Sequence, residues 1–438
     1  MFEKISSFPF GAYIKNKSIQ NFIFLVLIQA SNMLISIISM PLLIQSIGVD
    51  QFGLVNLALS VIIFTNIAVG FGFNISGPRE VAINQTDRKG LSKVVSQILF
   101  SRIFMAGVTA LLLLVSAYGF NFFKEYKTIL VFSIILLFSE ATLPLWFFQG
   151  MEKMKLISIT NVFSKLLFLF GIVLFIHSPE QSKWVNFILG VPALGLNLFL
   201  LLYIYYVMEI RFYWPKIKAI WFSLKDNVYL FLSNIVSHIT VSGGLIILSF
   251  FGNDTTLGMF SLSEKIMMVL RILPTLIIQA VYPNASKLYQ ISQEKFIRFL
   301  FKTYVFGLGA ALLLSLATFF SAEFIITILA KSRLEQSITY LKILSFIPFL
   351  ASLNIINGII LFVLNQKELL FKASLLMCFY MIGMSSLLTY KFGAVGLCVA
   401  LLSSELVIFI IYSFLIYLKN KQLVHAFFKL SFGSHHRP

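Results

Sequence analysis

Apolar runs long enough to cross a lipid bilayer follow one another along nearly the whole chain. Of its 438 residues, 59% are hydrophobic and only 12% are charged, whereas soluble domains carry about 25% charged residues. A transmembrane helix needs about 20 mainly apolar residues. We therefore predict an all-α polytopic membrane protein with twelve transmembrane helices, at 21–44, 53–76, 94–119, 128–150, 157–177, 184–208, 228–251, 257–282, 300–320, 338–364, 370–390 and 393–418.

The positive charges are divided unequally between the two sets of connections that join these runs. One set, which includes both chain ends, holds 23 Lys and Arg residues, and the other set holds 6. Lys and Arg accumulate on the cytoplasmic side of membrane proteins, so we predict that both termini are cytoplasmic. This topology accounts for the net charge of +17, and we expect no nucleic-acid partner.

The two halves of the chain have a similar layout. Glycine turns at Gly48 and Gly252, 204 residues apart, each precede a run with polar residues on one stripe. The longest cytoplasmic connection separates the halves, and its aromatic and basic segment 211–222 predicts a short helix in the headgroup layer. We predict two parallel six-helix repeats: an N-terminal lobe of residues 1–226 with this connector, and a C-terminal lobe of residues 227–438 with a cytoplasmic tail.

The run 257–282 carries three ionisable side chains, Glu264, Lys265 and Arg271. A centred Arg costs about 3 kcal/mol by insertion scales. Residues seven apart on a helix differ in direction by only about 20°, so Glu264 and Arg271 share one face, with Lys265 to one side. Such a face indicates a bundle interior or a watery cavity. The alternative is an internal Glu264–Arg271 pair that fixes helix packing.

Three further cations are candidates for a substrate site. Lys165 lies near the middle of its run, too deep to reach the surface easily, and we predict that it lines a cavity. Arg102 lies closer to the cytoplasmic face, where snorkelling is the alternative, and Arg79 lies at a cytoplasmic mouth. Lys165, Lys265 and Arg271 have no obvious partner, and unpaired cations indicate an anionic substrate group such as phosphate.

Two buried carboxyls are candidates for proton coupling. Glu140 and Glu405 each lie near the middle of a run without a partner nearby in the sequence, and desolvation raises the affinity of a carboxyl for protons. For Glu140 the alternative is a neutral acid, hydrogen-bonded to backbone freed by Pro144. His238 is a third candidate, with a helix-packing contact as its alternative.

The sequence lacks the common catalytic and nucleotide-binding motifs. It has no P-loop, no His-Glu-x-x-His and no nucleophile elbow, and its connections are too short for a catalytic domain. Cys378 and Cys398 both lie in apolar runs, without zinc-site spacing. We predict a transporter and not an enzyme, with no catalytic residue, cofactor or metal. Buried charges of both signs in two repeats favour alternating access.

The end of the run 128–150 resembles a family motif. The matching residues are Pro144, Trp146, Gln149, Gly150 and Glu152. They resemble the Trp-x-x-Gln-Gly-x-Glu pattern of Wzx-type oligosaccharide flippases, and the opening residues 41–80 are similar to that family's start. The likeness spans the whole twelve-run layout. Because the motif lies at a cytoplasmic helix end, we expect its residues to be structural.

The resemblance implies a transporter of the multidrug/oligosaccharidyl-lipid/polysaccharide (MOP) exporter superfamily, with two six-helix lobes in a V. It implies translocation of undecaprenyl-diphosphate-linked oligosaccharide repeat units from the cytoplasmic to the periplasmic leaflet of the bacterial inner membrane, through a cationic central cavity, for O-antigen or capsule assembly. The implied partners are the lipid-linked oligosaccharide, membrane lipids, a polysaccharide polymerase and a chain-length regulator. We expect a monomer.

Three alternatives stay open. A multidrug exporter of the same superfamily would usually carry an acidic residue in its first span, and 21–44 has none. A peptidoglycan-precursor flippase of the MurJ type would have two further spans. A non-transport membrane enzyme or subunit of polysaccharide assembly is disfavoured by the lack of a loop domain or catalytic motif.

Overall fold

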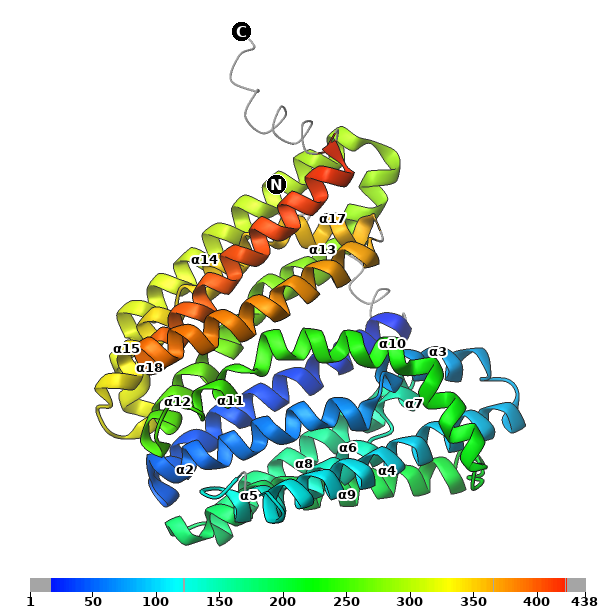
Figure 1. Cartoon of the computed structure of the whole chain (residues 1–438). Helices are drawn as coiled ribbons and strands as arrows, with labels where there is room; N and C mark the ends of the chain where they lie inside the picture. Colours follow the sequence, from blue (N-terminus) through cyan, green and yellow to red (C-terminus); the bar gives the residue numbers. More distant parts are fainter. Residues whose placement is uncertain (1–16, 121–122, 365, 422, 424–438) are drawn as a thin grey trace, which may run out of the picture. The chain divides into compact units, whose positions relative to one another are not determined.

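The computed structural model describes residues 17–120, 123–364, 366–421 and 423, and within them every regular element is a helix (Figure 1). This confirms the all-α prediction, while the predicted cytoplasmic ends at 1–16 and 424–438 lie outside the described residues. The elements in order are α2 (Lys17–Gly70), α3 (Phe73–Ile83), α4 (Arg88–Tyr118), α5 (Lys127–Ser133), α6 (Ile135–Thr142), α7 (Leu145–Gly150), α8 (Met154–Phe175), η1 (Pro179–Gln181), α9 (Ser182–Tyr206), α10 (Ile217–Ser242), α11 (Gly244–Leu248), α12 (Asp254–Leu270), α13 (Ile272–Ile291), α14 (Gln293–Ala330), α15 (Glu335–Leu344), α16 (Ile347–Ser352), α17 (Ile355–Val363) and α18 (Lys367–Lys419).

Nine stretches of helix in the described part of the chain are long and apolar enough to cross a membrane. Two of them, Ile23–Ile83 and Glu368–Lys419, have 61 and 52 residues, although one crossing needs only about 20. Each contains a glycine with positive φ, Gly48 at 79° in α2 and Gly393 at 60° in α18. A Cβ at either glycine would meet nothing within 4 Å. Glycine is therefore needed for the turn of the backbone and not for space.

The predicted span 128–150 is divided into the three short helices α5, α6 and α7, and Pro144 lies at the break between α6 and α7. Leu143 is extended, with φ −66° and ψ 110°, because the residue before a proline is pushed out of the helical region. Pro144 has no N–H to donate to the carbonyl of Glu140. The break therefore leaves backbone acceptors inside the membrane-spanning part of the chain that need other donors.

The chain forms two compact units, Met1–Ile235 and Val236–Pro438, called here the N-terminal and C-terminal units. Each unit has its own hydrophobic core. The predicted lobes at 1–226 and 227–438 stay a prediction. Fully buried core residues include Phe73, Val95, Phe147 and Leu200 in the N-terminal unit, and Phe296, Ile355, Ile359 and Leu361 in the C-terminal unit.

The connection before α10 is not helical until Ile217, so the prediction of a short helix over 211–222 is wrong for residues 211–216. The backbone N–H groups of Arg211 and Tyr213 donate to Ser92 Oγ and Ser96 Oγ of α4, at 3.2 and 2.9 Å. The two serines are one helical turn apart and share a face of α4. They hold the connector against α4, and Pro215 disfavours helix at the residue before it.

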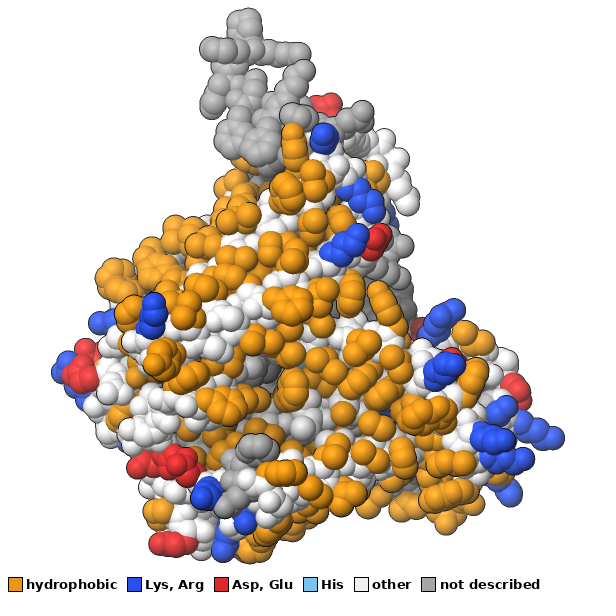
Figure 2. Space-filling model, in the orientation of Figure 1, with side chains coloured by type: hydrophobic (Ala, Val, Ile, Leu, Met, Phe, Trp, Pro, Cys, Tyr) orange, Lys and Arg blue, Asp and Glu red, His pale blue; other side chains and the backbone are white. Residues whose placement is uncertain are grey.

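The helices expose large apolar side chains over broad areas, and the charged side chains in view gather in groups (Figure 2). Phe306 and Phe320 on α14 are 72% and 80% exposed, and Phe170 on α8 is 61% exposed. Soluble monomers rarely expose apolar patches larger than a few hundred Å². This surface suits lipid and agrees with a multi-pass membrane protein.

Candidate functional site

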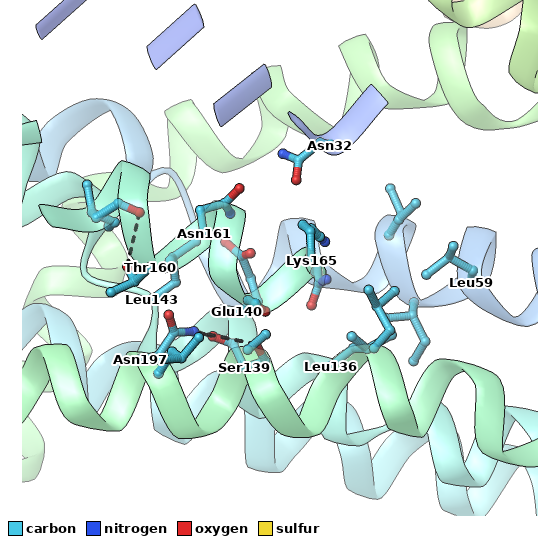
Figure 3. Close-up of a pocket in the computed structure, with 18 residues that line it drawn as sticks. Asn32, Leu59, Leu136, Ser139, Glu140, Leu143, Thr160, Asn161, Lys165 and Asn197 are labelled. Carbon is cyan, nitrogen blue, oxygen red and sulfur yellow. Dashed lines mark hydrogen bonds between the residues drawn. The ribbon is translucent and has the colours of Figure 1, made fainter. Parts of the chain in front are cut away.

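A polar cavity of about 380 Å³ lies within the N-terminal unit, enclosed by α2, α6, α8 and α9 (Figure 3). We call it the Lys165 cavity. Its polar side chains come from helices that are otherwise apolar, which is unusual in a membrane-spanning unit and points to function. They are Asn32, Asn66, Ser139, Glu140, Thr160, Asn161, Ser164, Lys165 and Asn197.

Lys165 enters the cavity from one polar face of α8. Asn161, Ser164 and Lys165 are spaced at i, i+3 and i+4, so the helical period brings them together, and Figure 3 shows Asn161 and Lys165 beside the same space. No ion pair or hydrogen bond joins the Lys165 ammonium to any described residue. Lys165 is half-buried, and a partly desolvated ammonium without a partner is costly, so packing alone does not explain it.

Several acceptor atoms around the cavity also lack partners. Asn32 Oδ1, Asn66 Oδ1 and Ser164 Oγ are buried and have no hydrogen-bond donor within the described residues. By contrast, Asn197 Nδ2 donates to the carbonyl of Ser139 at 2.8 Å. Buried polar atoms are nearly always bonded in folded proteins. These acceptors lie in the same cavity as an ammonium that has no protein partner, so a ligand with hydroxyl donors and a negative charge would satisfy both.

Arg102 of α4 binds Glu140, which lines the cavity. Its Nη2 lies 2.8 Å from Glu140 Oε1 and also donates to the carbonyl of Glu140, while Nη1 donates to the carbonyl of Leu143 at 3.1 Å. Arg102 therefore supplies the donors that the break at Pro144 removes. Its side chain is 0% exposed, and that of Glu140 is 25% exposed.

These contacts correct two expectations. Arg102 does not snorkel to the cytoplasmic surface, because three acceptors hold it inside the unit. Glu140 is not an isolated acid that is hydrogen-bonded to backbone freed by Pro144. Arg102 donates hydrogen bonds both to the Glu140 carboxylate and to the backbone carbonyls at the break. Neither partner could be read from the sequence, in which they stand 38 residues apart.

The C-terminal unit contains a second arginine–glutamate pair. Arg271 lies at the junction of α12 and α13, and its Nη2 is 2.6 Å from Glu405 Oε1 of α18. Asn354 Nδ2 contacts the carbonyl of Glu405 at 3.5 Å. The expectations that Arg271 is an unpaired cation and that it pairs with Glu264 are both wrong, and Glu405 is not without a partner.

Glu264 and Lys265 differ in exposure although they are neighbours on α12. Glu264 is buried at 6%, and a Cβ built at Gly244 of α11 would lie 3.4 Å from its Oε1. That distance is an ordinary van der Waals contact, so α11 packs against the carboxyl. Lys265 is half-buried and has interactions within the unit. On this face of the helix Ser261 and Glu264 are buried, and Met268 and Arg271 are partly exposed.

The family-motif residues pack α7 against α3. A Cβ built at Gly150 would lie 2.6 Å from the carbonyl oxygen of Pro78, and one built at Gly77 would lie 3.1 Å from Trp146 Cβ. Trp146 itself is 2% exposed. The two glycines allow the helices to touch, and this packing accounts for Trp146 and Gly150.

Four other predicted site residues are exposed, and the Lys165 cavity does not include them: Arg79, Gln149, Glu152 and His238. Sequence reasoning in turn missed Asn161, Ser164 and Asn197 as cavity residues, although their polar spacing on α8 and α9 could have been read from the helical period. Among the residues that the structure describes, no three His, Cys, Asp or Glu side chains gather as a metal site requires.

The chain is similar in sequence to proteins of polysaccharide assembly. A family model described as "Polysaccharide biosynthesis protein" matches residues 18–289. A protein of Escherichia coli (strain K12) named "Putative O-antigen transporter" is 24% identical over 412 residues, which are 92% of this chain and 97% of that protein. A protein of the same name from Shigella dysenteriae is 25% identical over 397 residues, which are 89% and 97% of the two chains.

Solved structures of two membrane transporters resemble the fold. An inward-facing multidrug resistance MATE family transporter of the MOP superfamily matches with a TM-score of 0.72 at 13% identity, covering 90% of this chain and 95% of that one. Lipid II flippase MurJ, in an inward closed conformation, matches with a TM-score of 0.68 at 13% identity, covering 94% and 90%. At these identities the likeness shows the fold alone.

Proposed function

The chain belongs to the polysaccharide biosynthesis protein family, and from that premise we propose that it is a flippase for lipid-linked oligosaccharides. It moves undecaprenyl-diphosphate-linked repeat units from the cytoplasmic to the periplasmic leaflet of a bacterial inner membrane, for O-antigen or capsule assembly. The relatives named as O-antigen transporters support this assignment. A polymerase and a chain-length regulator are the proposed partners that use the exported units.

The observation that carries the proposal is the Lys165 cavity. The sugars and diphosphate of such a substrate cannot cross hydrocarbon unaided, since buried polar groups without partners are costly. A site that lies within a membrane-spanning unit and offers an unpartnered ammonium and unpartnered acceptors provides the missing contacts. A cationic drug, the cargo of many multidrug exporters, would instead be repelled by Lys165.

We propose that Arg271 and Lys265 bind the diphosphate. Glu405 takes one amino group of Arg271, and a guanidinium has five N–H donors. With 28% of its side chain exposed, Arg271 keeps donors for a second anion. Its planar fork suits phosphate oxygens better than an ammonium does.

The proposed topology has twelve crossings with both ends in the cytoplasm. The two long stretches would each cross twice, turning at Gly48 and Gly393, and α10 with α11 would add one crossing to the nine stretches. Topology reporters fused at Gly90 and Gly252 should report the cytoplasm and the periplasm respectively. Reports from the same side at both positions would overturn this topology.

We propose alternating access as the mechanism, with Glu140 and Glu405 as the coupling carboxyls. Each acid is paired with an arginine within its own unit, so protonation of either acid would remove the counter-charge of that arginine. A pH gradient should then drive transport, and Glu→Gln substitution at the coupling acid should remove that dependence.

The direct test of the function is transport in purified vesicles. The protein is reconstituted with fluorescent undecaprenyl-diphosphate oligosaccharide, and a membrane-impermeant quencher reports how much lipid has changed leaflet. We expect exchange in protein-containing vesicles and none in protein-free vesicles. Exchange of fluorescent phosphatidylcholine at the same rate would show a non-specific scramblase and would contradict the proposal.

A further inference from the structure

The Lys165 cavity has a charge and a hydrogen-bonding pattern that narrow down its ligand. Resting on the flippase function proposed above, we infer that this cavity recognises a monosaccharide carrying one carboxylate, of the hexuronic acid class, within the repeat unit. The diphosphate of the carrier lipid is not its ligand.

The charge balance favours a single negative charge. Glu140 and Lys165 are the only ionisable side chains among the described residues that line the cavity. Arg102 behind the wall neutralises Glu140 at 2.8 Å, which leaves the one positive charge of Lys165. A sugar carboxylate balances this charge. A diphosphate diester carries two negative charges and would leave one of them without a counter-charge in the cavity.

The unpartnered acceptors match the hydroxyl groups of a sugar ring. Ser164 is only 4% exposed, and its Oγ lines the cavity without a partner. Asn32 and Asn66 of α2 each present an unpartnered Oδ1. Hydroxyl groups are donors as well as acceptors, so three ring hydroxyls would satisfy three atoms that the protein leaves unbonded. A phosphate diester has no donor for them.

The size and the remaining wall also fit one sugar residue. The volume of about 380 Å³ is near the lower end of the range of about 300–1,000 Å³ found for small-molecule sites. The apolar lining is aliphatic, contributed by residues such as Leu59, Ile62 and Leu136, and includes no aromatic ring. These side chains can cover the C–H groups of a pyranose.

The test compares three soluble probes on the full-length protein in lipid nanodiscs. D-glucuronate, D-glucose and inorganic pyrophosphate are titrated at constant ionic strength, with binding followed by saturation-transfer NMR. We expect glucuronate to bind about tenfold more tightly than glucose, equal to about 1.4 kcal/mol, and pyrophosphate not to displace it. Lys165→Gln should bring the ratio of the dissociation constants of glucose and glucuronate close to one.

Two further variants separate recognition from folding. Ser164→Ala should weaken the binding of glucose and of glucuronate by similar factors, because it removes a hydroxyl contact and keeps the charge of Lys165. Lys155→Gln, at an exposed position of the same helix α8, should leave the ratio unchanged. Equal binding of the two sugars by the unmodified protein, displacement of glucuronate by pyrophosphate, or an unaltered ratio in Lys165→Gln would each overturn the inference.

Vesicle transport distinguishes this inference from the function on which it rests. Two lipid-linked oligosaccharides that differ only in one glucuronate or glucose residue are compared. Preference for the acidic one, reduced in Lys165→Gln, supports the inference. Equal transport of both, unaffected by Lys165→Gln, would leave the flippase standing and refute the acidic-sugar site. Transport of neither would refute the flippase, whatever the cavity binds.

Discussion

Two of the arginine–glutamate pairs in the described part of the chain lie within predicted membrane spans, and they differ in which member is exposed. In the N-terminal unit Arg102 is 0% exposed and Glu140 is 25% exposed. In the C-terminal unit Arg271 is 28% exposed and Glu405 is 6% exposed. The N-terminal pair therefore presents its acid, and the C-terminal pair presents its cation.

This difference separates a structural pair from one that is available to a ligand. Arg102 binds its acid and two carbonyls at the break after α6, so it holds the helix break together. Arg271 binds one acid and keeps other donors for an anion. The N-terminal unit draws its free positive charge from a separate residue, Lys165.

The largest effect should follow removal of Arg102. Arg102→Met would leave Glu140 and the carbonyl of Leu143 without their donors, and breaking a buried pair costs about 3–5 kcal/mol. Thermal unfolding of the detergent-solubilised protein should show a large drop in stability. Arg79→Met at an exposed position of α3 is the control, with an effect within about 0.5 kcal/mol. Equal stability of the two variants would mean that Arg102 does not hold the break.

The next largest effect tests the asymmetry of the pairs directly. Glu140→Gln leaves the charge of Arg102 fully buried without a counter-ion, and we expect a loss of about 2 kcal/mol, since hydrogen bonds to charged groups contribute about 1.5–3 kcal/mol. Glu405→Gln leaves Arg271 in partial contact with water, and the loss should stay below about 1 kcal/mol. The two variants are compared by denaturant or thermal unfolding, and the opposite order would contradict the comparison.

A third test concerns Arg271 and export. Arg271→Ala should lower transport about tenfold, a change of about 1.4 kcal/mol, with nearly normal amounts of protein. Arg271→Lys should keep part of the activity, because the charge remains while the planar fork is lost. Transport is measured in vesicles and scaled to the protein present. If transport falls only in proportion to the amount of protein, Arg271 serves helix packing and not substrate binding.

The smallest expected change in stability comes from a comparison of two asparagines, one whose side chain is hydrogen-bonded and one whose side-chain oxygen has no partner. Asn66→Leu removes an unpartnered acceptor, so stability should change by less than about 0.5 kcal/mol. Asn197→Leu removes the hydrogen bond to Ser139 and should cost about 1 kcal/mol. The difference would appear in thermal unfolding. A larger loss for Asn66→Leu would show that its side chain is bonded within the unit.

The sequence predicted the helical membrane class because that class depends on composition and run length, which are local. It also identified Arg102, Glu140, Lys165, Arg271 and Glu405 as abnormal, since a charge inside an apolar run is visible without a structure. It could not predict which charges meet. Arg271 and Glu405 stand on helices whose contact depends on tertiary packing, and helical spacing relates only residues on one helix.

Helix breaks were predictable only in part. Pro144 indicates the helix break between α6 and α7, and Gly48 lies in a turn that the sequence predicts. The division of the predicted span 338–364 into α15, α16 and α17 was not foreseen, although Pro348 begins the middle helix. Proline at a first helical turn is compatible with a continuous run, so the sequence alone does not show where such a helix starts anew.

The central claim is that the Lys165 ammonium serves the substrate and not the fold, and Lys165→Met tests it most directly. Removing a half-buried charge that has no partner should leave the melting temperature unchanged or higher, because apolar replacement of desolvated charge is often neutral or stabilising. Flippase activity in vesicles should fall at least tenfold in the same preparation. A lower melting temperature with normal activity per folded molecule would contradict the account.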